Sequence, residues 1–236
     1  MYMYLKLPNK IIDSLRRMLP AFIVATIVTF TVGIYYAILN SPPDYLQGDS
    51  MRIMYVHVPA AWLALSSYSF LALSCIAWFI FRNPIFNLFA KSIAPIGATF
   101  TLIALVTGSI WGKPTWGTWW AWDARLTSML ILFFLYIAYI MTWQTITNKD
   151  LAAKISAALG IIGFINIPII KFSVDWWNTL HQPATISKLS APSIHISMLT
   201  PLMLMTFAYV LFLITLFLIR YKIEILDQKI LRVSNQ

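Results

Sequence analysis

Long stretches without a charged residue alternate with short polar segments along this chain. No Asp, Glu, Lys or Arg occurs in the runs 18–43, 53–81, 92–112, 126–148, 155–170 and 189–219. A helix needs about 20 apolar residues to cross the hydrocarbon core, and five runs exceed that length. The fifth run is shorter, but Lys154 and Lys171 flank it and their long side chains can reach outward. We therefore predict six helices, near 19–39, 60–81, 92–110, 127–147, 154–171 and 198–219.

The composition supports one membrane-embedded domain over residues 1–236. Hydrophobic residues make up 60% of the chain and charged residues 11%, whereas soluble domains carry roughly 25% charged residues. We therefore predict an all-α integral membrane protein, a bundle of six transmembrane helices. The first apolar run is longer than the core of a signal peptide, about 7–15 residues, so we interpret it as an uncleaved anchor. Cys75 is the only cysteine, which excludes an intrachain disulfide.

The positive charges predict how the bundle lies in its membrane. Six spans place both termini on one side, and twelve of the 17 Lys and Arg residues fall on that side. Because positive loops stay inside, we predict cytoplasmic termini, and the net charge of +9 needs no nucleic-acid partner. The opposite side, periplasmic in a bacterial inner membrane, then holds the loops 40–59, 111–126 and 172–197. These loops contain all three histidines and seven of the ten tryptophans.

A tryptophan-rich segment joins the third and fourth predicted spans. Half of the ten tryptophans lie in it: Trp111, Trp116, Trp119, Trp120 and Trp122. Four of its residues share the i, i+3, i+4, i+7 spacing of one helix face: Trp116, Trp119, Trp120 and Asp123. Helix-breaking residues precede them: Gly112, Pro114 and Gly117. We therefore predict a turn followed by a short amphipathic helix at the periplasmic surface of the membrane.

The same tryptophans have two interpretations. Tryptophan prefers the headgroup level, so the segment can belong to an aromatic belt. A belt scatters its rings over several helix ends, whereas here Trp176 and Trp177 add to five rings in one neighbouring loop. The clustering favours a platform for a large planar ligand, and a tetrapyrrole such as heme fits best. Asp123 and Arg125 either contact that ligand or pair with each other.

Two histidines in different outer loops suit axial ligation of a heme iron. His57 precedes the second span and His181 follows the fifth, so their imidazoles can approach opposite faces of one iron. Either histidine alone is typical of a solvated interfacial residue, but the pair beside the tryptophans indicates ligands. His195 has no aromatic neighbours, and we predict that it is not a ligand. The heme carboxylates need cations, and four lie in the outer loops: Arg52, Lys113, Arg125 and Lys188. Arginine offers a two-pronged contact, so Arg125 and Arg52 rank first.

The tryptophan-rich segment and the whole chain resemble a known family. Residues 111–127 are similar to the WWD signature of heme-handling membrane proteins, and the whole chain resembles the heme exporter protein C family, also called cytochrome c maturation protein C. Four further segments carry the resemblance: 57–61, 94–98, 105–109 and 176–182. A larger relative, the cytochrome c heme lyase subunit, shares the signature but has many more spans.

The resemblance implies a heme-delivery factor rather than a turnover enzyme, and no triad or carboxylate pair in the chain suggests hydrolysis. It implies axial ligation of heme b by His57 and His181, with the signature loop cradling the ring. The predicted contacts are His57, His181, Trp111, Trp116, Gly117, Trp119, Trp120, Trp122, Asp123, Arg125 and Arg52. It also implies partners: a membrane-anchored periplasmic heme chaperone, a small one-span accessory subunit, and an ABC-type ATPase with its permease.

Two other functions are also compatible with the sequence. A permease for heme or another solute usually needs ionisable groups inside its spans, and these charge-free runs contain none. A scaffold without a cofactor would use the tryptophan segment to bind another protein. Absorption by a bound pigment separates heme binding from the scaffold.

Overall fold

The computed structural model describes residues 9–182 and 192–234, which are predominantly helical. Helix α1 (Asn9–Ile34) continues into a π-helical segment (Tyr35–Asn40), and a 3₁₀ helix (Asp49–Ile53) leads into α2. The remaining helices are α2 (Met54–Phe81), α3 (Ile85–Trp116), α4 (Ala124–Thr145), α5 (Lys149–Gly163), α6 (Asn166–Trp176) and α7 (Ile196–Ser234).

The prediction of six membrane-spanning segments is confirmed by length and composition. Six helical segments are long and apolar enough to cross a membrane: Lys10–Asn40, Asp49–Phe81, Ile85–Trp116, Ala124–Thr145, Lys149–Trp176 and Ile196–Ile230. Most helices extend beyond the predicted bounds, because polar residues at both ends continue the helix past the apolar core. The largest extensions are at the C-terminal end of α7, which runs to Ser234, and at the start of α1, which begins at Asn9.

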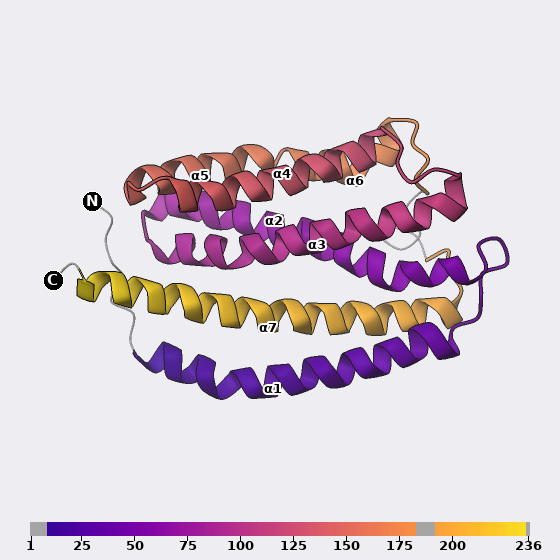
Figure 1. Ribbon diagram of the computed structural model, residues 1–236, viewed down its shortest axis with the longest axis horizontal. Helices are drawn as coiled ribbons and strands as arrows, with labels where there is room; N and C mark the ends of the chain where they lie inside the picture. The colour runs from indigo at the N-terminus through magenta and orange to yellow at the C-terminus, as the bar shows by residue number, and fades with distance from the viewer. Residues whose placement is uncertain (1–8, 183–191, 235–236) are drawn as a thin grey trace.

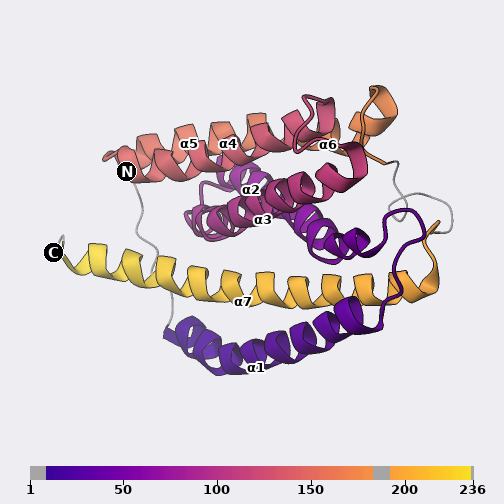
Figure 2. The same ribbon diagram turned by 45° about the vertical axis from the view of Figure 1, so that its right-hand side comes forward.

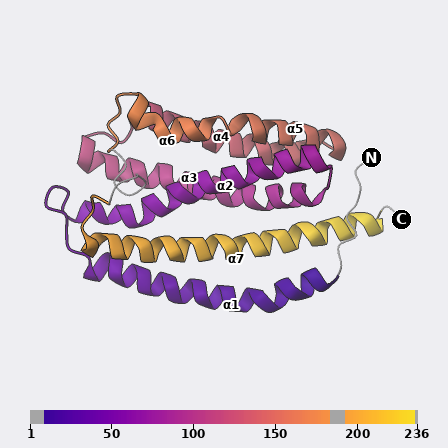
Figure 3. The same cartoon turned by 180° about the vertical axis from the view of Figure 1, so that it is seen from behind.

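The helices form three adjacent groups (Figure 1). The hairpin of α2 and α3 lies in the middle, with α4, α5 and α6 on one side and α7 on the other. Helix α1 packs mainly against α7 and lies outermost, as Figures 2 and 3 also show. The first residues of α1 and the last of α7 lie at one end of the bundle. We call the other end, where α3 and α6 finish and α2, α4 and α7 begin, the distal end.

Small residues let the central helices approach closely. A Cβ atom on Gly97 of α3 would overlap the ring of Tyr136 from α4. Tyr136 is fully buried, and its hydroxyl donates a 2.8 Å hydrogen bond to the carbonyl of Ala64 on α2. This one side chain therefore joins three helices, and the missing side chain at Gly97 makes room for it.

The fifth span is broken inside the membrane-spanning segment. Helix α5 ends at Gly163 and α6 begins at Asn166. Pro168 explains the break, because proline has no N–H and its ring excludes the carbonyl four residues earlier, that of Phe164. The Asn166 side chain donates a 2.8 Å hydrogen bond to the carbonyl of Ser128 on α4. Gly163 lies against the Tyr68 hydroxyl, so the absence of a side chain there lets the broken span pack closely against α2.

The predicted amphipathic helix at Trp116–Asp123 is wrong. Helix α3 continues through Gly112 and Pro114 to Trp116, and residues 117–123 form an irregular connection. Gly117 ends α3 in the left-handed region at φ 77°, which glycine adopts without strain. Asp123 is extended and caps α4 by accepting a 2.8 Å hydrogen bond from the Leu126 N–H. These two cap residues leave no room for a separate helix between them.

Charged side chains hold α3 and α7 together near the opposite end. Lys91 of α3 forms an ion pair with Glu224 of α7, a carboxylate that is 5% exposed. The Lys91 ammonium also lies 5.1 Å from the centre of the Trp143 ring on α4. Three helices are thus tied to one another at the end that the outer loops do not reach.

We expect Gly97→Ala to lower the thermal unfolding midpoint of the detergent-purified protein more than Tyr136→Phe does. Overpacking a buried site costs about 1–3 kcal/mol, whereas losing one hydrogen bond costs about 1 kcal/mol. Thr99→Ala, on the exposed side of α3, is the matched control and should leave the midpoint nearly unchanged. Equal midpoints for Gly97→Ala and Thr99→Ala would contradict the close approach.

Candidate functional site

A cavity of about 590 Å³ opens at the distal end of the bundle. Its volume lies within the range of small-molecule and cofactor sites, about 300–1,000 Å³. Apolar side chains from five helices form its deeper wall: Val58, Ala61, Leu65, Leu105, Met129, Ile170, Met198 and Leu202. Near the helix ends and loops, a part that we call the rim, polar side chains line it among aromatic and aliphatic ones: Gln47, Ser109, Arg125, Lys171, His181, Gln182 and His195. An amphiphilic ligand therefore finds an apolar interior and a polar mouth.

His57 lies in the first turns of α2, and α3 fixes its orientation. Its Nδ1 atom is 3.1 Å from the hydroxyl oxygen of Thr107. That hydroxyl donates to the carbonyl of Ile103 at 2.6 Å, so it accepts the bond from His57 and Nδ1 carries the proton. The lone pair is then on Nε2, the form of imidazole in which Nε2 can bind a metal.

Gly108 and Trp111 complete the surroundings of His57. A Cβ atom on Gly108 would lie 2.9 Å from Cε1 of the imidazole, so only glycine lets this ring pack against α3. The Trp111 ring meets the imidazole edge to face, with centroids 5.7 Å apart. Its indole N–H donates a 2.9 Å hydrogen bond to Gln47 of the first outer loop. The Trp111 indole is therefore held by His57 on one side and by Gln47 on the other.

His181 follows α6 and contacts Arg125 at the start of α4. The Arg125 Nη1 atom lies 3.3 Å from His181 Nδ1, and the carbonyl of Gln182 lies 3.1 Å from the same nitrogen. Arginine can only donate and a carbonyl can only accept, so Nδ1 makes one of these two bonds at a time. Burial lowers the pKa of His181 below its ordinary value of 6.5, and the Arg125 charge lowers it further. The imidazole is thus neutral at neutral pH.

The structure brings the two predicted axial histidines together. The ring centroids of His57 and His181 are 6.4 Å apart, and their planes differ by 32°. Imidazole–metal bonds are about 2.0 Å long, so two imidazoles on opposite sides of one metal ion have centroids separated by about 6 Å. The observed separation matches that requirement.

The tryptophan segment divides into two parts. Trp111, Trp116 and Trp120 line the cavity, and the Trp116 ring lies 6.0 Å from that of His181. The indole N–H of Trp120 is buried and has no hydrogen-bond partner among the described residues, so it can serve a ligand. Trp119 and Trp122 are 55% and 79% exposed and do not line the cavity.

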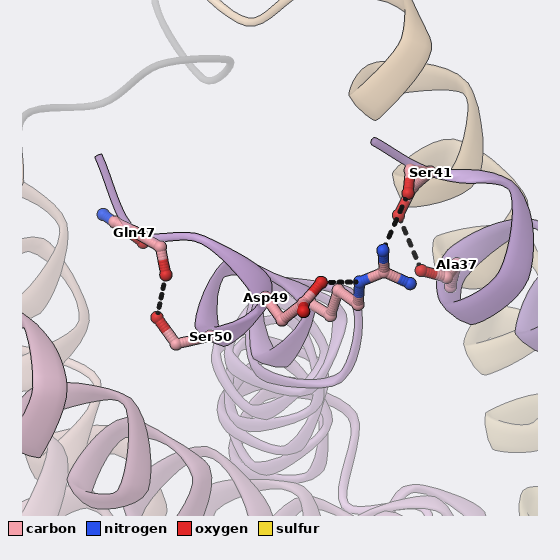
Figure 4. Close-up of polar contacts among 6 residues, drawn as sticks. Ala37, Ser41, Gln47, Asp49 and Ser50 are labelled. Atoms are coloured by element: carbon pink, nitrogen blue, oxygen red, sulfur yellow. Dashed lines mark hydrogen bonds and ion pairs between the residues drawn. The ribbon is translucent and has the colours of Figure 1, made fainter. Parts of the chain in front are cut away.

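Three other predicted contacts lie outside the cavity lining. Gly117 caps α3 and Asp123 caps α4, as described above. Arg52 donates to Asp49 and to the carbonyl of Ser41, each at 3.0 Å. These contacts join the first outer loop to the end of the π-helical segment (Figure 4). The three residues thus shape the surrounding loops, and their contact with heme stays a prediction.

The other three cationic residues predicted to meet the heme carboxylates differ in their surroundings. Arg125 lines the cavity, and the Ser173 hydroxyl and the Lys171 carbonyl accept hydrogen bonds from its guanidinium at 3.1 and 3.3 Å. Lys113 is exposed and donates to the carbonyl of Gly117, which helps to end α3. Lys188 lies outside the described residues. Arg125 is therefore the predicted carboxylate partner that the structure places at the cavity.

Some residues of the cavity had no signal in the sequence. Gln47 reaches it from the loop before α2 and belongs to no recognisable spacing pattern. His195 also borders the cavity, although its neighbours in the sequence gave no reason to place it there. Only the packing of α7 against α2 and α3 brings it to this position.

The residues present fit a heme group. Two neutral imidazoles stand at the separation of axial ligands, and Gly108 provides the close approach that positions one of them. A buried, unpartnered indole N–H at Trp120 and the Arg125 guanidinium supply donors for an anionic acceptor. The described residues hold no cluster of three or more His, Cys, Asp or Glu side chains suited to a bare metal ion.

Comparisons with known proteins identify the family to which the chain is similar. A sequence model of the family described as "Heme exporter protein C" matches residues 1–236. The chain is 43% identical over 223 residues to heme exporter protein C of Bradyrhizobium diazoefficiens, which covers 94% of this chain and 84% of the relative. For heme exporter protein C of Escherichia coli K12, the identity is 43% over 218 residues, covering 92% and 88%. A cytochrome c biosynthesis ccmC-like mitochondrial protein of Marchantia polymorpha is 51% identical over 188 residues, covering 80% and 79%.

We expect Arg125→Gln to raise the pKa of His181 toward its ordinary value, because the variant removes a positive charge beside the ring. Arg125→Lys keeps the charge and should give a smaller rise. The measurement is an NMR titration of histidine-labelled protein, with the His181 signal assigned by its loss in His181→Gln. An unchanged pKa in Arg125→Gln would show that the two side chains do not interact.

Proposed function

The chain belongs to the heme exporter protein C family of cytochrome c biogenesis factors, and we propose that it binds heme b at the distal cavity. From there it presents heme to a membrane-anchored chaperone, which is loaded covalently for c-type cytochrome assembly. The observation that carries this proposal is the His57–His181 pair, 6.4 Å apart between ring centroids beside Trp111 and Trp116. The proposal makes the protein a delivery factor, with no general acid or base of its own.

The histidines, tryptophans and arginine of the cavity would have different roles in heme binding. His57 and His181 would bind the iron from its two sides. The Trp111 ring contacts His57 edge to face, and the Trp116 ring packs against His181 at a tilt. Bound heme supplies the redox-active iron and the reactive ring edge. A metal bond to His181 Nε2 requires the proton on Nδ1, which selects the hydrogen bond to Gln182 over the one from Arg125. The Arg125 guanidinium is then available to a heme carboxylate.

The proposal also includes an orientation and partners. Both helical ends near the termini lie at one end of the bundle, and the excess of positive charge there supports a cytoplasmic location. The distal cavity then faces the periplasm, where the chaperone's soluble part would reach it. The small one-span subunit and the ABC-type ATPase with its permease are proposed partners on the ground of family membership.

We expect the purified protein to show a low-spin heme spectrum, as isolated or after incubation with heme. His57→Ala and His181→Ala should each lose the low-spin form, because one imidazole cannot occupy both axial positions. Absorption spectra of the oxidised and reduced proteins make the measurement, and circular dichroism controls for folding. A colourless wild-type protein would favour a scaffold, and fully loaded chaperone with either variant would contradict axial ligation.

We expect Thr107→Val to weaken heme binding by about tenfold, because outer partners of ligating histidines typically contribute that much to affinity. The variant has the same shape but cannot accept the His57 Nδ1–H bond. Thr107→Ser keeps the hydroxyl and is the matched control. Titration of the heme-free protein, followed by absorbance, gives both affinities, and equal values for the two variants would contradict this role of Thr107.

A further inference from the structure

His195 borders the same cavity as His57 and His181 but belongs to a different helix. It stands directly before α7, and its carbonyl accepts the Leu199 N–H at 3.0 Å, which makes it the cap residue of that helix. Its side chain is exposed. The proposed heme site assigns no role to this third histidine.

The hydrogen bonds of His195 identify its tautomer. Its Nδ1 atom lies 3.3 Å from the backbone nitrogen of Ser197 and 2.8 Å from the Ser197 hydroxyl. A backbone N–H can only donate, so Nδ1 is an acceptor and the ring proton is on Nε2. In this tautomer the Nε2 atom carries a proton and has no free lone pair for a metal. It is instead a hydrogen-bond donor.

The division of the cavity into interior and rim indicates which part of heme this donor would meet. The deeper wall is apolar and its side chains carry no charge, from Val58 and Leu65 on α2 to Leu202 on α7. The carboxylates of heme are costly to bury without donors, so they belong at the rim. Arg125 lies on the rim at the start of α4, and His195 lies on it at the start of α7.

We propose that the Nε2–H of His195 donates a hydrogen bond to a propionate carboxylate of the bound heme. His195 is thus a positioning residue that acts from α7, while Arg125 acts from α4. The inference rests on the proposed function, because it requires heme in this cavity. It adds a donor from α7 to those of Trp120 and Arg125.

Two variants of His195 separate the donor from the helix cap. Asparagine is a favoured cap residue, but its side chain is too short to reach where Nε2 lies, so His195→Asn keeps the cap and removes the donor. Glutamine is longer and offers an amide N–H, so His195→Gln should restore part of the contact. Each protein is titrated with ferric heme and with heme dimethyl ester, in which both carboxylates are esterified.

We expect His195→Asn to weaken the binding of heme by about three- to tenfold, the usual effect of one lost hydrogen bond. The affinity for the dimethyl ester should stay at the wild-type value, and His195→Gln should fall between wild type and His195→Asn for heme. All three proteins should keep the low-spin spectrum, because the axial ligands are intact.

Three results would overturn the inference while leaving the proposed function in place. The first is an unchanged affinity of His195→Asn for heme. The second is an equal loss of affinity for heme and for its dimethyl ester in His195→Asn, and the third is loss of the low-spin spectrum in that variant. Wild-type protein that binds neither compound would instead overturn the proposed function, and this inference with it.

Discussion

The close contact of the start of α2 with the last turns of α3 determines the geometry of the whole site. Gly108 leaves room for the His57 ring, and Thr107 one residue earlier orients it. This contact depends in turn on the packing of the central helices, where Gly97 admits the Tyr136 ring that bonds to α2. Small residues along α3 therefore position an imidazole at the distal end. The second imidazole needs only a short segment after α6 to meet it.

The spans could be predicted from the sequence, because a run of about 20 residues without a charge is typical of a helix that crosses the hydrocarbon core. The sequence also led to the two histidines that the fold brings together, since both lie in loops predicted to share one side of the membrane with the tryptophan segment. The predicted helix in that segment was wrong because helical spacing was given more weight than the end signals. Gly117 and Asp123 are typical residues at a helix end and a helix start, and both act in those roles.

Other parts of the site follow from contacts between distant segments and have no local signature. Gln47 meets Trp111 across 64 positions of the sequence, and His195 reaches the cavity only because α7 packs against the central hairpin. The division of the tryptophans has the same origin. Trp120 lies inward while Trp119 and Trp122 lie outward, and the path of an irregular connection decides that, since no helix face aligns them.

The distribution of polar groups argues for a binding site at one face rather than a conduit through the bundle. A path for an anionic, planar molecule would need donors along its length, but the deeper wall of the cavity is apolar. Beyond it, the Tyr136 hydroxyl bonds across the centre, and Lys91 with Glu224 joins α3 to α7 near the far end. This arrangement favours a site that is reached from the distal end of the bundle. In the proposed function, the polar side chains near the helix ends would hold the charged edge of the ligand at this face.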